Sequence, residues 1–185
     1  DRTGRTTKTA TEQMTGGMGN VESAIKGVIA AFAAWQIGKY VQEAALLAAR
    51  YETLGVVMRV VGNNAGYTGQ QMNAFEQSLQ KQGIAMIEAR QTLTQMASAH
   101  MDLSKSSELA RIAQDAAVIG QMNSSEAFEK MITGIQRGEV EILKTLGLNV
   151  DFAGAQERLA SQLGKSTQSL TQVEKVQANM NATML

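Results

Sequence analysis

Residues 21–62 read VESAIKGVIAAFAAWQIGKYVQEAALLAARYETLGVVMRVVG, with no proline and only three internal glycines. The short side chain of Asn20 can accept hydrogen bonds from the free amides of a first helical turn, so this residue is a suitable N-cap. Gly62, followed by two asparagines, is a suitable end because these residues tolerate the left-handed conformation. The pattern predicts one helix over about residues 20–62, roughly 60 Å long. This length is about four times that of an average helix, so we expect the helix to serve more than a small globular core.

The apolar residues of this stretch form one stripe of the expected helix. They recur in steps of three and four; the second half comprises Tyr40, Ala44, Leu47, Tyr51, Leu54, Met58 and Val61, and the first half comprises Val21, Ile25, Val28, Phe32 and Trp35. The two halves are out of phase by one residue, which predicts a kink or local unwinding between Trp35 and Tyr40. Such a stripe packs against other helices, of its own chain or of another copy. We expect self-association through these residues, with a monomeric bundle as the alternative.

Composition narrows the classes of function. The chain has 185 residues, enough for one domain with a core, or for one domain and an arm. Its 17 basic and 17 acidic residues cancel, and only 4% of residues are aromatic, so nothing favours nucleic-acid binding. The absence of cysteine excludes disulfides, zinc–thiolate sites and cysteine nucleophiles. Without proline, and rich in alanine, glutamine, methionine, leucine and glutamate, the chain is predicted to be all-α.

The first 19 residues are polar and rich in threonine, and they lack the apolar core of a signal peptide. We expect a flexible arm over residues 1–19. Because the chain starts with Asp1 and ends inside a helical pattern, we expect it to be a piece of a longer protein. The apolar run Val28–Gly38 raises the question of a membrane. Extending it to spanning length brings in Lys39, which costs about 2.5–3.5 kcal/mol against about 0.3–0.6 per good apolar residue, so spanning is disfavoured.

After Gly62, the sequence predicts about seven shorter helices in a bundle domain over residues 63–185, and no strand. Thr68 and Gln71 form a capping-box pattern, Asn123 and Glu126 form a second N-terminal signal, and glycines follow several apolar runs. The expected helices cover about residues 68–82, 86–100, 105–121, 123–138, 140–146, 152–163 and 165–185.

No group of residues forms a recognisable catalytic or cofactor site. His100 is the only histidine, and a position near the end of a helix favours an interaction with the helix dipole over catalysis. Glu126 and Glu129 share a helix face but are typical of a charged first turn. The loop GNNAGYTG follows no strand and carries no phosphate-binding lysine. We therefore expect no enzyme activity, no metal and no cofactor.

Three segments resemble the tail tape measure proteins of bacteriophages. They are YETLGVVMRVVGNNAG (Tyr51–Gly66), the stretch from GIAMIEARQTLTQMASAHMDLSKSSELARIAQDAAVIG to GEVEILKTLGL (residues 83–148), and LGKSTQSLTQVEKVQANMNATML with its Glu174–Lys175 pair. In the family, an apolar helix leads into a loop and a capped helix, and a turn similar to Gly138–Gly147 follows later. The likeness covers about residues 17–185, and the order of the motifs makes it more specific than any one of them.

The resemblance implies a structural protein of the virion, made in the bacterial cytoplasm, that occupies the lumen of the tail tube. It would set tail length through the fixed rise of a helical chain and leave ahead of the DNA. Its implied partners are tail tube, tail tip and tail assembly chaperone proteins. Some members help to open the host envelope, so a membrane-active helical domain is the alternative function. The short, glycine-terminated helices after Gly62 favour a compact domain of such a protein, with the long helix leading to an extended part.

Overall fold

The structure, a computed structural model, describes the backbone of residues 39–185 and the side chains of residues 46–185. In this part of the chain there are eight α-helices, two short 3-10 helices and no strand. The all-α prediction is therefore confirmed for the described residues. Residues Leu54–Leu185 form one compact unit, and its boundary with the preceding residues lies between Thr53 and Leu54. The predicted arm and the predicted helix before Lys39 lie outside the described residues.

Helix α3 (Lys39–Asn64) is the described part of the predicted long helix and is continuous over 26 residues. Its end lies beyond the expected one, because Gly66 and not Gly62 takes the left-handed conformation, with φ of 92°. The Tyr67 N–H donates to the Gly62 carbonyl and the Gly66 N–H donates to the Asn63 carbonyl. This Schellman arrangement satisfies carbonyls that the end of a helix leaves free. The prediction of a stop at Gly62 was therefore wrong by one turn.

Helices α4 (Gly69–Lys81) and α5 (Met86–Ser98) follow the predicted pattern closely. The Thr68 side chain accepts from the Gln71 N–H, while the Gln71 side chain accepts from the Thr68 N–H, so the capping box is present. Met72 and Leu79 are fully buried, and the ring of Phe75 meets Tyr67 edge to face at 5.6 Å. Local sequence signals thus fix both ends of α4.

A 3-10 turn, Leu103–Lys105, leads into α6 (Ser106–Gly120), and α7 (Ser124–Arg137) follows. Asn123 caps α7 by accepting from the Glu126 N–H at 2.9 Å, as predicted. Ile119, in the last turn of α6, is 67% exposed. Gly134 lies inside α7 against Leu143, and Gly138 is the left-handed end of the helix.

The last three helices are α8 (Val140–Thr145), α9 (Phe152–Gln162) and α10 (Gln172–Thr183), with a 3-10 turn at Thr167–Ser169. The end of α8 at a left-handed Gly147 matches the prediction. The predicted single helix over residues 165–185 is wrong, because α10 begins only at Gln172. A second capping box, between Thr171 and Glu174, starts that helix. The Thr–x–x–Glu pattern of this capping box is a local signal in the sequence.

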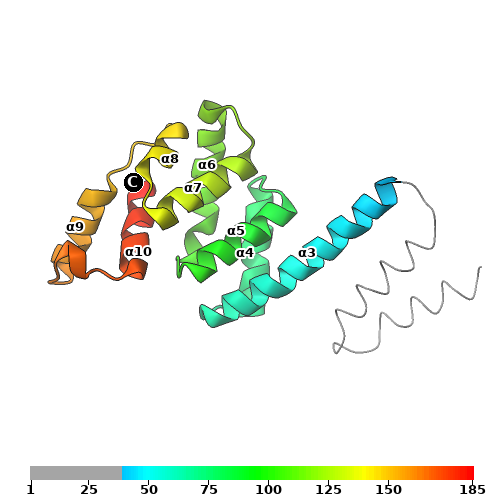
Figure 1. Cartoon of the computed structure of the whole chain (residues 1–185), viewed down its shortest axis with the longest axis horizontal. Helices are drawn as coiled ribbons and strands as arrows, with labels where there is room; N and C mark the ends of the chain where they lie inside the picture. Colours follow the sequence, from blue (N-terminus) through cyan, green and yellow to red (C-terminus); the bar gives the residue numbers. More distant parts are fainter. Residues whose placement is uncertain (1–38) are drawn as a thin grey trace, which may run out of the picture. The chain divides into compact units, whose positions relative to one another are not determined.

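Helix α7 is the centre of the unit Leu54–Leu185. It packs against α5, α6, α8 and α10 (Figure 1). Its apolar face is completely buried and comprises Ala127, Phe128, Met131, Ile132 and Ile135. In the same unit, α9 packs against α10, and α4 packs against α5. The core is therefore built around α7, with the other helices arranged about it.

Candidate functional site

The candidate site is the apolar surface of α3. Met58 is fully buried in the core cluster, and Val61 packs against the same cluster while partly exposed. Leu54 and Tyr51 are half-buried, whereas Leu47, from the same predicted stripe, is 55% exposed. The side chain of Tyr40 and the residues Val21, Ile25, Val28, Phe32 and Trp35 lie outside the described part of the chain. We call the side of α3 that carries Leu54, Met58 and Val61 its covered face.

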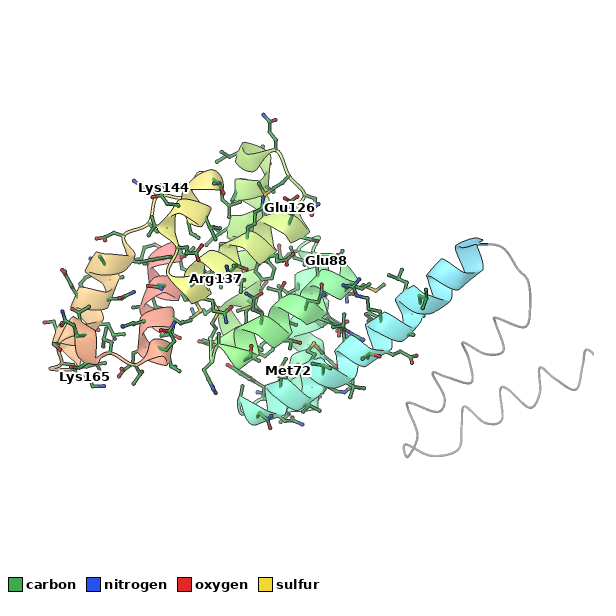
Figure 2. The ribbon with its side chains drawn as sticks, in the orientation of Figure 1. Met72, Glu88, Glu126, Arg137, Lys144 and Lys165 are labelled. Atoms are coloured by element: carbon green, nitrogen blue, oxygen red, sulfur yellow. The ribbon has the colours of Figure 1, made fainter. Side chains whose placement is uncertain are left out.

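Two glycines on the covered face leave room for side chains from α4 and α5. A Cβ atom at Gly62 would lie 2.5 Å from the side chain of Met72, which is labelled in Figure 2, and this is too close for any real contact. A Cβ atom at Gly55 would lie 2.8 Å from the guanidinium carbon of Arg90. Gly62, expected to end the helix, thus serves its packing instead. A side chain at either glycine would force the neighbouring Met72 or Arg90 side chain to shift.

The same interface contains a buried ion pair. The Nε atom of Arg90 on α5 donates to Oε1 of Glu76 on α4 at 2.9 Å, and the two side chains are 11% and 6% exposed. Gln80 also donates to this oxygen at 3.1 Å. No local pattern in the sequence indicates this pair, because neither Glu76 nor Gly55 is near Arg90 in the sequence. The pair joins α4 to α5 beneath α3.

Other positions around α3 carry further apolar residues. Val56, Val57 and Val60 are 40%, 40% and 54% exposed, although they alternate with the buried residues of the covered face. We call these three valines the outer stripe. A helix that is apolar on all sides is normally enclosed by other helices. The sequence stripe identified the covered face and missed the outer one.

The loop between α3 and α4 has a structural role. The Tyr67 hydroxyl accepts a hydrogen bond from the Leu103 N–H at 3.1 Å, and its ring packs on Phe75. The glycine-rich segment GNNAGYTG therefore ties the end of α3 to the 3-10 turn before α6. Gly66 supplies the left-handed residue that this connection needs.

The residues considered for catalysis lie in ordinary structural settings. His100 follows α5 in a left-handed conformation, and its N–H closes the helix by donating to the Ala97 carbonyl. Glu126 lies in the first turn of α7 and pairs with Lys130 at 2.9 Å, one helical turn along. Within the described residues, no three acidic or histidine side chains are grouped so that they could hold a metal ion.

One carboxyl group has a strongly shifted pKa. The Lys165 ammonium, 2.6 Å from Oε1 of Glu174, together with hydrogen bonds from Thr171, lowers the pKa of Glu174 to about 2. These contacts belong to the start of α10, where a carboxylate also interacts favourably with the helix dipole. The lowered pKa of Glu174 is explained by the ion pair with Lys165 and by the capping contacts with Thr171.

None of the helices in residues 39–185 combines the length and the apolar character required to cross a bilayer. The run Val28–Gly38, for which membrane contact was considered, precedes the described residues. Comparisons with protein-family models, curated proteins and solved structures found no match to this chain.

Proposed function

We propose that this chain is a structural segment of a bacteriophage tail tape measure protein, consisting of a folded helical domain to which α3 connects an extended part. The support comes from the resemblance of residues 51–66, 83–148 and 163–185 to that family, in the same order. The positions that carry the resemblance also have defined roles in the fold. Gly66, Gly138 and Gly147 are left-handed helix ends, and Glu174 caps α10.

A single observation supports the proposed division into a folded domain and an extended part. The compact unit starts at Leu54, in the middle of the continuous helix α3 (Lys39–Asn64). One helix thus belongs at its end to a bundle and at its start to a different unit. In a tape measure protein, this is how a chain would pass from an extended rod, whose length counts residues, into a folded domain. The proposed partners are the tail tube, tail tip and tail assembly chaperone proteins.

Tail length tests this proposal in the phage that encodes the chain. Removing residues 39–52 takes away whole heptads and keeps the phase of α3, and it shortens a helix by about 21 Å. We expect tails shorter by that amount in averaged electron micrographs. A matched virus with Leu47→Ala, which keeps the residue count, should have tails of normal length. Normal tails from the deletion virus would contradict a ruler role for this helix.

The alternative, a membrane-active domain, remains a prediction based on Val28–Gly38. It requires the purified chain to float with anionic liposomes at neutral pH and to lose this property when Val28 and Phe32 are both changed to glutamate. Absence of flotation by the unmodified chain would eliminate the alternative.

A further inference from the structure

The part of α3 that belongs to the compact unit, Leu54–Asn64, is held to the bundle by few side chains. Its buried residues are Gly55, Met58 and Gly62, and the two glycines contribute no side chain. Met58 is completely inaccessible to solvent, whereas α7 contributes five apolar residues of this kind. Stabilisation by burial grows with the apolar area removed from water. This part of α3 is therefore held more weakly than α7.

A charged pair lies under α3. The backbone of α3 at Gly55 lies against the guanidinium group of Arg90, which pairs with Glu76 at 2.9 Å. The side chains of Arg90 and Glu76 are 11% and 6% exposed, so both ions have lost most of their water. Removing a cover from such ions restores their hydration, which offsets the apolar contacts that are lost. Lifting α3 from this pair therefore costs less free energy than lifting a helix from a purely apolar surface.

The loop after α3 combines a conformationally free residue with an anchored one. Gly66 has φ of 92°, and a Cβ atom built on it would meet no other atom within 4 Å. The next residue, Tyr67, is anchored to the bundle, because its ring packs on Phe75 and its hydroxyl accepts from the Leu103 N–H. A few loop residues of this kind absorb the movement between two packed elements. Gly66 thus has the properties of a hinge.

Helix α4 begins without a hydrogen bond from the lifted part of α3. Its first turn is capped by Thr68, and Gln71 completes the capping box by accepting from the Thr68 N–H at 2.8 Å. These bonds lie on the α4 side of Gly66, so they stay in place when α3 moves. The helices from α4 onward therefore keep their local supports in the absence of α3.

We propose that residues Leu54–Asn64 form a lid that opens about Gly66 while α4 to α10 stay folded. The open state exposes Met58 on the lid, Met72 on α4 and the charged pair beneath them. Segments with few buried apolar contacts open in this way without unfolding of the whole domain. The lid controls access to the surface of α4 and α5 that α3 covers. This inference is independent of the assignment to a phage tail.

Methionine oxidation of the purified full chain tests the lid, because a peroxide converts an accessible thioether to the sulfoxide. Met72 and Met131 are both fully buried, whereas Met86 is 53% exposed. Met72 should react more slowly than Met86 but at least about tenfold faster than Met131, since a local opening is populated more often than global unfolding. Mass spectrometry of peptides after short reaction times gives the three rates. A Met72 as slow as Met131, or as fast as Met86, would overturn the proposal.

A matched pair of variants tests the hinge. Gly66→Ala and Gly164→Ala each place a Cβ atom on a left-handed residue with open space around it, so both lower the stability of the closed fold. Opening of the lid relieves this strain at Gly66 but not at Gly164. Gly66→Ala should therefore speed the oxidation of Met72 by about tenfold, and Gly164→Ala should leave it unchanged. Equal rates of Met72 oxidation in the two variants would contradict a hinge at Gly66.

Hydrogen exchange gives an independent measurement of the same opening. The amides of Leu54–Asn64 should exchange together, and their exchange should depend less on added urea than that of α7, because the open lid exposes less surface than the unfolded chain. A single rate and a single urea dependence for both helices would mean that α3 leaves the bundle only by global unfolding. That result would reject the lid.

Discussion

Helices α7 and α3 are both strongly apolar, but their surroundings differ. Four helices pack on α7, and its apolar residues Phe128, Met131 and Ile132 are completely inaccessible to solvent. In α3, the bundle covers Met58 but leaves Val56, Val57 and Val60 open. The apolar face of α7 is matched to its neighbours within the chain. The apolar residues of α3 exceed what the described residues of the bundle cover.

The largest expected effect contrasts the two helices directly. Phe128→Ala should lower the free energy of unfolding by about 3–5 kcal/mol, since it leaves a cavity at the centre of the core. Val57→Ala should change it by about 0.5 kcal/mol or less, because the bundle does not enclose this side chain. Urea unfolding of both variants, at concentrations where the chain is monomeric, measures the difference. Equal losses would mean that α3 is enclosed within its own chain.

The next effect concerns the interface beneath α3. Arg90→Leu should destabilise the bundle by about 3 kcal/mol, because it leaves the buried Glu76 carboxylate without its main cation. The double variant Glu76→Leu/Arg90→Leu should recover most of this loss, since it buries no isolated charge. A double-mutant cycle by chemical unfolding measures the coupling. If the double variant is as unstable as the single one, the pair contributes by shape and not by charge.

Whether a feature of these helices can be predicted from the sequence depends on how far apart in the sequence the interacting residues lie. The caps at Thr68 and Asn123 and the glycine ends at Gly138 and Gly147 were predictable, because each involves residues within one turn. The start of α10 was predictable in principle from Thr171 and Glu174. The presence of the seven helices after α3 was also predictable, because the periodic pattern of apolar residues in each helix is a local feature.

The contacts that hold α3 could not be predicted. The role of Gly62 depends on Met72 in the next helix, and that of Gly55 on Arg90, two helices away. Buried Asn179 likewise donates to the carbonyl of Ile135, 44 residues earlier. Nothing in the local pattern of any of these residues specifies its partner. The apolar period of α3 was also ambiguous, because two stripes with different phases share the helix.

A smaller effect is expected where α6 and α7 end differently. Both close with a left-handed residue, but α7 uses Gly138 whereas α6 uses Gln121, with φ of 52°. A residue with a Cβ atom costs roughly 1–2 kcal/mol in this conformation. Gln121→Gly should therefore stabilise the bundle by about 1 kcal/mol. Thermal unfolding measures the gain, with Gln121→Ala as the control that keeps the Cβ atom and should give none.

The smallest effect is expected at the start of α10, the last helix in the sequence. The pKa of Glu174 falls from 4.5 to about 2 in the folded chain, mainly through Lys165 and Thr171. Its contribution to stability is complete above pH 4.5 and is lost as the pH falls towards about 2, because the unfolded chain takes up the proton first. Glu174→Gln should therefore flatten the acid side of the stability curve within this range.

The control for that experiment is Glu141→Gln, which removes an exposed pair with Lys144 on α8. A surface pair of this kind contributes little, so the melting temperatures of this variant between pH 6 and about pH 2 should parallel those of the unmodified chain. If Glu174→Gln also runs parallel, the capping contacts of α10 do not favour the carboxylate over its protonated form. The stability of α10 would then come from its packing on α7 and α9.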